Sequence, residues 1–279
     1  MKNFALFINE DKDKNLKHTN AVLDFLKKEN CMCYARGLGI RPIELDCPVL
    51  DKKSAKLCDA AIVLGGDGTM LKAIKFFDEI QIPFLGINLG TLGFLTDVKM
   101  NEIEKRLTDL TSGNYSIDKR TMIRLYRGRK PLGDALNEVM AKHIFGAGTG
   151  EFKVYSDNVL LGDYSADGIL VVAPTGSTAY SLSAGGPIVN PKCAIMLIQP
   201  IAPHSLNNRC IIVNAQETVK LVFRPRTTNV CIDGEVVRNT GNKVEIKLSP
   251  RTVSFIKFSD YNFYELVFDK FKNIMNIRG

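Results

Sequence analysis

The chain has 279 residues, of which 45% are hydrophobic and 24% charged, a balance typical of a folded globular protein and not of a disordered or fibrous one. The net charge of +7 comes from 37 basic and 30 acidic residues scattered along the sequence, which favours small polyanionic metabolites over nucleic acid as partners. Seven cysteines without a C-x-x-C spacing indicate reduced thiols, and no apolar run approaches the length of a membrane span. We therefore expect a cytoplasmic protein that binds neither nucleic acid nor membrane.

The first part of the chain alternates strand-like and helix-like segments. Strands are predicted at 4–8, 60–64 and 83–87, and helices at 15–28, after Thr69, and at 101–110. This alternation predicts a parallel sheet with helices packed on it, that is, a Rossmann-like α/β domain over residues 1–115.

The apolar strand predicted at 60–64 runs directly into Gly65-Gly66-Asp67-Gly68-Thr69. Glycines allow a ligand to approach the backbone N–H groups closely, and the N-terminus of the following helix favours anions. A carboxylate beside phosphates is repelled unless a metal lies between them or a hydroxyl must be deprotonated, so Asp67 indicates phosphoryl chemistry. The alternative is a tight turn in which Asp67 only caps the helix. The chain contains no Gly-Lys dipeptide, which excludes the Walker A pattern.

After about Tyr115 the sequence changes to short β-type runs separated by turn residues. These runs lie at 122–126, 152–155, 159–161, 169–173, 194–198, 210–213, 218–223, 229–232, 243–248 and 253–258. So many short strands predict a larger, all-β, sandwich-like domain over residues 116–259. Within it, Asp233-Gly234 is the strongest hairpin signal. The last stretch, 261–277, is helical in pattern, and we expect residues 260–279 to pack back on the N-terminal domain.

Two further segments and two residue pairs are suited to binding a nucleotide. Residues 86–95 are rich in glycine and follow a predicted strand, so they should lie beside Gly65-Gly66 at one edge of the sheet. Residues 174–187 combine hydroxyls and small residues, and Tyr180 among them can stack on a planar ring. Asn137-Glu138 could read an adenine edge and hold ribose hydroxyls, and Asp167-Gly168 precedes the strand at 169–173. Each segment alone is also compatible with ordinary loop packing.

Taken together, these segments resemble the NAD kinase family. The resemblance is carried, in the family's order, by Gly65 to Thr69, Gly86 to Leu95, Asn137-Glu138, Asp167-Gly168, Pro174 to Pro187 and Pro203-His204-Ser205-Leu206. The first motif is shared with diacylglycerol and sphingosine kinases and is related to phosphofructokinases, whereas Pro174 to Tyr180 makes the match specific. The resemblance implies transfer of the γ-phosphoryl of ATP to the 2′-hydroxyl of the adenosine ribose of NAD.

The resemblance also implies a role for individual residues. Asp67 is similar to the family's proton acceptor, with Gly68 against the same nucleotide, while Gly65, Gly66 and Thr69 form the phosphate turn. Asn137 and Glu138 resemble the pair that binds adenine and ribose, and Asp167 resembles the acid at the nicotinamide end. The remaining residues that align with dinucleotide contacts are Lys72, Phe94, Ser165, Thr178, Ala179, Tyr180, Ser183, Ala202 and Glu235.

The chain departs from the family pattern on the nicotinamide side. Ala173 stands where the family usually has Thr, Ser165 where many members have a basic residue, and Gly148 where some have His. The family's cofactor would be Mg²⁺ or another divalent metal that arrives with ATP, and no protein ligands are assigned to it. Other nucleoside triphosphates or polyphosphate are alternative donors, and a homodimer or homotetramer is expected.

Two other functions remain compatible with the glycine turn. A lipid or sphingoid kinase would use the same turn, although we find no amphipathic membrane-facing helix. A non-catalytic sensor of NAD or NADP would bind the dinucleotide without turnover, and a pure binder has no need for a base at Asp67.

Overall fold

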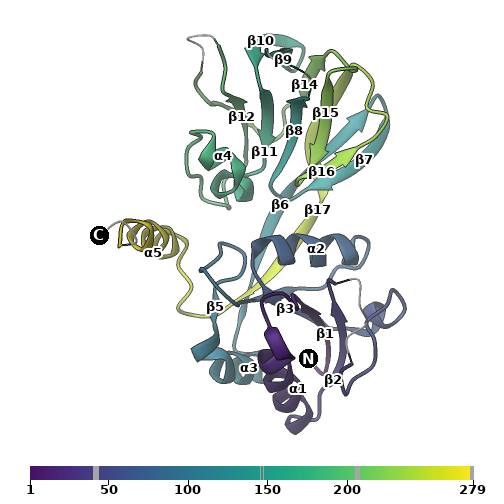
Figure 1. Ribbon diagram of the computed structural model, residues 1–279, viewed down its shortest axis with the longest axis vertical. Coiled ribbons are helices and arrows are strands. Elements are labelled where there is room, and N and C mark those ends of the chain that lie inside the picture. Colours follow the sequence, from purple (N-terminus) through teal and green to yellow (C-terminus); the bar gives the residue numbers. More distant parts are fainter. Residues whose placement is uncertain (40–43, 145, 147, 205–207, 277–279) are drawn as a thin grey trace. The chain divides into compact units, whose positions relative to one another are not determined.

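The computed structural model describes residues 1–39, 44–144, 146, 148–204 and 208–276, with the side chains of 273–276 left aside. The described chain forms two compact units. One contains Met1–Lys119 together with Ser254–Gly279, and the other contains Arg120–Val253. Two strands, β6 (Ser116–Arg127) and β17 (Lys243–Lys257), run from one unit into the other (Figure 1). The second unit is therefore an insertion within the first.

The N-terminal unit is built on a parallel sheet, as predicted. Its strands follow the order β4-β3-β1-β2, and a short strand pairs with β4. Their bounds are β1 Asn3–Ile8, β2 Met32–Gly37, β3 Ala60–Gly65, β4 Phe84–Asn88 and β5 Val98–Lys99. Strand β2 was not predicted, and its six residues include only two that are buried, Cys33 and Ala35. The all-buried strands β3 and β4 were predicted within one residue of their ends.

Helices cover both faces of this sheet (Figure 1). They are α1 (Lys17–Lys28), α2 (Asp67–Phe77) and α3 (Ile103–Ser112). Alternate residues of β1, including Phe4 and Leu6, are buried with α1 and α3. Phe7 points to the other face, where its ring centroid lies 6.0 Å from that of Phe77 in α2. The alternation along β1 thus gives each helix layer its own core.

The second unit is an antiparallel sandwich, as predicted. One sheet has the order β13-β12-β11-β8-β15-β16, and the other contains β10-β9-β14-β17 with β6 paired to β17 and to β7. The strands not yet bounded are β7 Lys130–Ala135, β8 Glu138–His143, β9 Gly150–Ser156, β10 Val159–Ala166, β11 Gly168–Val172, β12 Ile195–Ile201, β13 Ile211–Asn214, β14 Val219–Phe223, β15 Thr228–Ile232 and β16 Glu235–Val237. Buried side chains of both sheets form one core, which includes Phe152 and Val171.

Two features of the second unit differ from the prediction or refine it. The strands predicted at 243–248 and 253–258 are one continuous strand, β17, because Pro250 and Arg251 keep the extended backbone. Between β15 and β16, Asp233 has φ 46° and Gly234 has φ 85°. Two consecutive left-handed residues are the signature of a type I′ turn, so the predicted hairpin is confirmed.

The last helix, α5 (Phe263–Asn276), belongs to the N-terminal unit. Its residues Phe263 and Leu266 form a small buried cluster with Phe94, and the ring centroids of Phe94 and Phe263 are 6.5 Å apart. The predicted return of the C-terminal helix to the first domain is therefore confirmed. Among the described residues, no helix combines the length and hydropathy that a membrane span requires.

Candidate functional site

The predicted phosphate turn joins β3 to α2 in the N-terminal unit. Strand β3 ends at Gly65, Gly66 is the N-cap, and the helix begins at Asp67, three residues earlier than the start after Thr69 that the sequence suggested. Thr69 Oγ1 accepts hydrogen bonds from Asn9 Nδ2 at 3.0 Å and from Gly66 N at 3.4 Å. A Cβ on Gly65 would lie 2.4 Å from this same Oγ1, so only glycine allows Thr69 to tie the turn to the end of β1.

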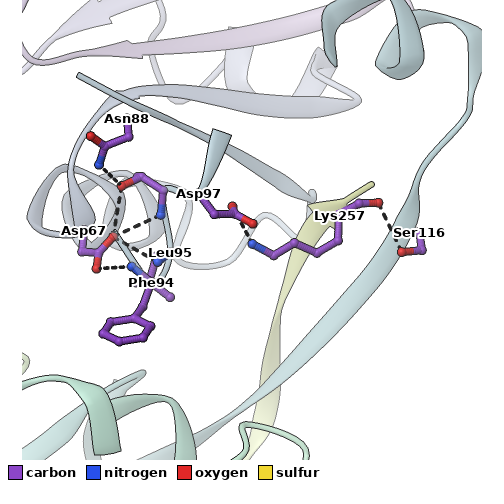
Figure 2. A network of polar contacts seen from close by, with 8 residues as sticks. Asp67, Asn88, Phe94, Leu95, Asp97, Ser116 and Lys257 are labelled. Atoms are coloured by element: carbon purple, nitrogen blue, oxygen red, sulfur yellow. Dashed lines mark hydrogen bonds and ion pairs between the residues drawn. The ribbon is translucent and has the colours of Figure 1, made fainter. Parts of the chain in front are cut away.

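The Asp67 carboxylate faces the loop that follows β4 (Figure 2). Its Oδ2 accepts one hydrogen bond, from Phe94 N at 2.8 Å. Its Oδ1 accepts three, from Leu95 N at 3.0 Å and from Thr96 N and Oγ1, both at 3.1 Å. The two glycine-rich segments therefore lie side by side, as predicted, and the carboxylate orients both. Oδ2, with a single donor among the described residues, is the oxygen with remaining acceptor capacity.

The loop that holds Asp67 is itself tightly organised. Asn88, 5% exposed, donates from Nδ2 to Thr91 O at 2.9 Å and to Thr96 Oγ1 at 3.0 Å, and its Oδ1 accepts from Gly90 N at 2.7 Å. A Cβ on Gly93 would lie 2.1 Å from Asp67 Oδ1. The predicted segment 86–95 thus places glycine where the carboxylate approaches the backbone most closely.

A buried ion pair continues this network. Asp97 Oδ1 lies 2.7 Å from Lys257 Nζ, with side chains 13% and 4% exposed (Figure 2). The Lys257 ammonium also lies 4.4 Å from the centroid of the Tyr261 ring. The backbone carbonyl of Lys257 accepts a hydrogen bond from Ser116 Oγ at 3.2 Å. Asp97 and Lys257 were not among the predicted site residues. A lysine inside the apolar run Phe255-Ile256-Lys257-Phe258 was the available signal.

The remaining predicted residues of this unit fall into two classes. Phe94 is 9% exposed and packs against Phe263, whereas Gly68 and Lys72 are exposed on α2.

In the described part of the chain, no group of three or more His, Cys, Asp and Glu side chains is arranged to hold a metal ion. The carboxylate of Asp67 is already engaged by protein donors.

In the second unit, the hairpin turn organises the predicted Asn137-Glu138 pair. The Asp233 carboxylate accepts hydrogen bonds from the backbone N–H groups of Leu136, Asn137 and Glu138 at 2.8, 2.9 and 3.0 Å. Burial raises the pKa of Asp233, while these three N–H donors act in the opposite direction. Sequence reasoning treated Asp233 only as a turn residue, so its contact with the segment 136–138 was missed.

Glu138 is a buried carboxyl group. It is 8% exposed, and its Oε2 has no hydrogen-bond partner among the described residues. Burial, with a smaller contribution from the charge of Asp233, raises the pKa of Glu138 to about 7. A hydroxyl donor on a ligand would satisfy this oxygen at little cost in desolvation.

The hydroxyl-rich segment packs directly against Asn137. It forms a 3-10 helix, Pro174–Thr178, followed by the short helix α4, Tyr180–Ser183. Ala173 N donates to Asn137 O at 2.8 Å, and a Cβ on Gly176 would lie 2.2 Å from that oxygen. Of the predicted contacts here, Tyr180 and Ser183 are exposed, and Thr178 and Ala179 are half-buried. Two segments that are distant in sequence, around Asn137 and at 173–183, therefore lie together in this unit.

A second group of predicted residues gathers at the other end of β11. Asp167 N donates to Ile201 O at 3.0 Å, and Ser165 O accepts from His204 N at 2.8 Å. Asp167, Ser165 and Ala202 are all exposed, and Ala202 has φ 44°. The Ser165 hydroxyl is hydrogen-bonded to Thr149. Because β8 and β11 pair with Glu138 opposite Val172 and Lys142 opposite Gly168, this group lies at the opposite end of β11 from Glu138.

The remaining predictions are Glu235 and the segment 203–206. Glu235 lies on β16, exposed, next to the Asp233 turn. Of the segment Pro203-His204-Ser205-Leu206, Ser205 and Leu206 lie outside the described residues, and His204 is exposed.

Comparison with known proteins agrees with this arrangement. Residues 4–115 match the family model of the ATP-NAD kinase N-terminal domain, and residues 136–258 match that of the ATP-NAD kinase C-terminal domain. The chain is 34% identical to the NAD kinase of Lachnospira eligens over 97% of this chain and 100% of that protein. It is also 34% identical to the NAD kinase of Ruminiclostridium cellulolyticum, covering 97% of this chain and 98% of that one.

Two solved structures share the fold. The crystal structure of an NAD kinase from Archaeoglobus fulgidus in complex with ATP has a TM-score of 0.79 and 21% identity, covering 97% of this chain and 98% of that one. Yeast NADH kinase complexed with NADH has a TM-score of 0.80 and 21% identity, covering 96% of this chain and 86% of that one. Together with the Asp67 turn and the Asn137-Glu138 pair, the matches over both units show that this chain belongs to the NAD kinase family.

Proposed function

We propose that Asp67 is the general base that deprotonates the 2′-hydroxyl of the adenosine ribose of NAD. The chain is a phosphotransferase that uses ATP to convert NAD to NADP, as its family membership shows. The single observation that supports Asp67 as the base is the unequal use of its two oxygens. Within the described part of the chain, Oδ1 accepts three hydrogen bonds and Oδ2 accepts one, so Oδ2 is held in a fixed direction with lone-pair capacity for a hydroxyl donor.

In this proposal the phosphoryl group passes directly from ATP to NAD, without a covalent enzyme intermediate. The 2′-hydroxyl proton passes to Asp67 as the 2′-oxygen forms a bond to the γ-phosphorus of ATP. The bond between this phosphorus and the oxygen that bridges to the β-phosphate breaks, and ADP leaves with the electron pair. The protein positions the two reactants and stabilises charge, and the position of Asp67 at the first residue of α2 serves the first of these roles.

In this proposal a divalent metal enters the site bound to the phosphates of ATP. Mg²⁺ in kinases is held by one or two carboxylates together with substrate phosphates, and dedicated all-protein cages are unusual. The described residues contain no cluster that could form such a cage. We therefore treat the metal as part of the Mg-ATP substrate, which supplies charge neutralisation, and assign no step to it.

We assign the adenosine half of NAD to the surface formed by Asn137, Glu138 and the segment 174–180. The unpartnered Oε2 of Glu138 supports this assignment, because a ribose hydroxyl is a suitable donor for it. Asn137 is 9% exposed and can pair with an adenine edge, and the exposed ring of Tyr180 can stack on a planar group.

The nicotinamide half belongs, in this proposal, to the group around Asp167 and Ala202. Four residue steps of β11 separate this group from the position opposite Glu138, which is roughly 14 Å along a strand. Self-association, with Asp167 supplied by a second copy of the chain, would let one dinucleotide reach both groups. Oligomeric state and cytoplasmic residence remain predictions, and light scattering on the purified protein tests the first.

The test of the base is the Asp67→Asn variant. With Mg-ATP and NAD, the wild-type chain should form NADP, and the variant should turn over about 10² or more slowly, as expected for loss of a catalytic base. Asp24→Asn, an exposed carboxylate on α1, is the matched control and should keep wild-type turnover. Near-normal turnover of Asp67→Asn would remove Asp67 from the base role.

The same assay separates the rival functions. Phosphorylation of lipid vesicles in place of NAD would favour a lipid kinase. Tight binding of NADP without ATP-dependent turnover would favour a sensor. A scan of donors against NAD and NADH would establish whether other nucleoside triphosphates or polyphosphate are accepted.

A further inference from the structure

Lys12 lies beside the phosphate turn, although no motif drew attention to it. Lys12 follows β1, and Asn9 at the end of β1 is hydrogen-bonded to both β3 and α2. Asn9 N donates to Leu64 O at 3.0 Å, and Asn9 Nδ2 donates to Thr69 Oγ1 at 3.0 Å. Lys12 N in turn donates to Asn9 O at 3.1 Å. The backbone of Lys12 is thus tied, through one tight turn, to the residues that carry Asp67.

The Lys12 ammonium lies against both glycine-rich segments. A Cβ on Gly66 would lie 2.9 Å from Lys12 Nζ, and a Cβ on Gly90 would lie 3.9 Å from it. The side chain of Lys12 therefore reaches over the N-cap of α2, toward the loop after β4. Glycine at position 66 therefore leaves room for the ammonium, whereas a Cβ at position 90 would only be in ordinary contact with it.

This position is electrostatically unfavourable for a lysine without an anion nearby. The first N–H groups of a helix carry a partial positive charge, and cations are destabilising there. Within the described chain, Lys12 has no ion-pair partner, since the Asp67 carboxylate is directed to the N–H groups of the 94–96 loop. An anion placed at the turn would interact favourably with both the ammonium and the helix N-terminus.

Space for such an anion exists beside Gly68. A Cβ added to Gly68 would meet no atom within 4 Å, so the surface of the first helical turn is open. Gly68 is exposed, next to the Asp67 carboxylate that acts on the ribose hydroxyl in the proposed reaction. The group nearest to that hydroxyl during transfer is the γ-phosphoryl of ATP.

We propose that Lys12 is a catalytic residue whose ammonium binds the γ-phosphoryl group of ATP over the Gly66–Gly68 turn. This inference rests on the proposed function of Asp67. As the bond to the 2′-oxygen forms and the bond to the bridging oxygen breaks, Lys12 stabilises the negative charge on the non-bridging oxygens of the phosphoryl group. Lys12 exchanges no proton, so the bonds formed and broken, and the transfer of the proton to Asp67, stay as described above.

The test compares Lys12→Met with Lys12→Arg and with Lys14→Met, which removes an exposed lysine two residues away. We expect Lys12→Met to lower kcat/KM for ATP by about 10² or more, the range for loss of one charge-stabilising donor, with KM for NAD within about twofold of wild type. Lys12→Arg should recover most of the loss, and Lys14→Met should match wild type. A Lys12→Met enzyme within about threefold of wild type overturns the proposal.

A binding measurement makes the result independent of the base. Calorimetric titration with inorganic tripolyphosphate should show affinity in the wild type and in Asp67→Asn, and a loss of about tenfold or more in Lys12→Met. If the wild-type protein fails to phosphorylate NAD, the proposed function fails, while this titration still decides whether Lys12 binds a polyphosphate. Equal affinity in wild type and Lys12→Met overturns the role of Lys12. Unchanged thermal unfolding of the variants excludes misfolding as the cause.

Discussion

Asp67 in the N-terminal unit and Asp233 in the inserted unit use the same device with different neighbours. Each carboxylate lies at a turn and accepts hydrogen bonds from three backbone N–H groups of a segment distant in sequence. Asp67 has the Lys12 ammonium near its turn, whereas Asp233 lies beside the buried acid Glu138 and contributes to the rise in its pKa. The comparison teaches that a turn carboxylate organises a loop in either setting, and that the neighbouring charge decides what chemistry the loop can perform.

The largest expected effect on stability concerns the ion pair that supports the Asp67 loop. Lys257→Met would leave Asp97 buried without its cation, and we expect the free energy of unfolding to fall by about 3–5 kcal/mol. Chemical denaturation followed by circular dichroism measures this. Lys99→Met, which removes an exposed lysine of β5, should have little effect. Adding Asp97→Asn to Lys257→Met should restore part of the loss, and a failure to do so would mean that packing of the lysine stem dominates.

The second effect tests the buried acid beside Asp233. Folded Glu138 has its pKa raised from 4.5 to about 7, so between these pH values the folded chain holds a proton that the unfolded chain releases. The contribution of Glu138 to stability is therefore most favourable below pH 4.5, declines as pH rises to 7, and is constant above. Over this range the unfolding free energy of the wild type should fall by about 3 kcal/mol relative to Glu138→Gln. Parallel pH curves for the two proteins would contradict the raised pKa.

The third prediction sets the two turn carboxylates directly against each other. Asparagine tolerates the left-handed backbone of Asp233, so Asp233→Asn and Asp67→Asn each replace one acceptor oxygen without backbone strain. If the oxygen keeps the Oδ1 position, each variant loses one backbone bond, from Leu136 N or from Phe94 N. Both should lose about 2 kcal/mol of unfolding free energy, since each leaves one N–H group without its acceptor.

The activities of this pair should diverge. Only Asp67→Asn is expected to lose the chemical step, whereas Asp233→Asn should chiefly raise KM for NAD through the displaced segment 136–138. An equal loss of kcat in both variants would show that Asp67, like Asp233, acts only by holding its loop.

The smallest effect concerns the hydroxyl of Thr96. This hydroxyl donates to Asp67 Oδ1 at 3.1 Å and accepts from Asn88 Nδ2 at 3.0 Å. Thr96→Val keeps the shape and removes both bonds, with an expected cost of about 1 kcal/mol and less than a tenfold loss of kcat. Differential scanning calorimetry and steady-state kinetics measure the two quantities. A larger loss of kcat would indicate that the third bond to Oδ1 is essential for the direction of Oδ2.

The sequence predicted those parts of the molecule whose signals are local. Buried strands β3 and β4, the hairpin at Asp233 and the glycine turn at Asp67 each have a continuous signature in a few residues. Strand β2, in which only Cys33 and Ala35 are buried, was missed. The number of strands in the inserted unit was underestimated where β7 and β8 carry mixed polar and apolar residues.

The contacts that organise the site could not be predicted in the same way. Asp67 binds residues 94–96, Asp233 binds 136–138, and Lys257 pairs with Asp97, 160 positions earlier in the chain. Such pairings depend on which chain segments the fold brings together, and a single sequence does not contain that information. The resemblance to a family supplied the candidate site residues, whereas the contacts of Lys12, Asp97, Asp233 and Lys257 were found only from the structure.

The division of the chain has a consequence for its synthesis. Arg120–Val253 form one continuous segment, so every residue of the sandwich has been synthesised before Ser254 is added. The α/β unit, by contrast, takes its last residues from the end of the chain, including Phe255, which pairs with Phe84, and Lys257, the partner of Asp97. Although domains usually fold in the order of translation, here the unit that starts first is completed last. A nascent chain stalled before Ser254 and then released would therefore contain the whole sequence of the sandwich, while the loop that orients Asp67 would still lack its supporting cation.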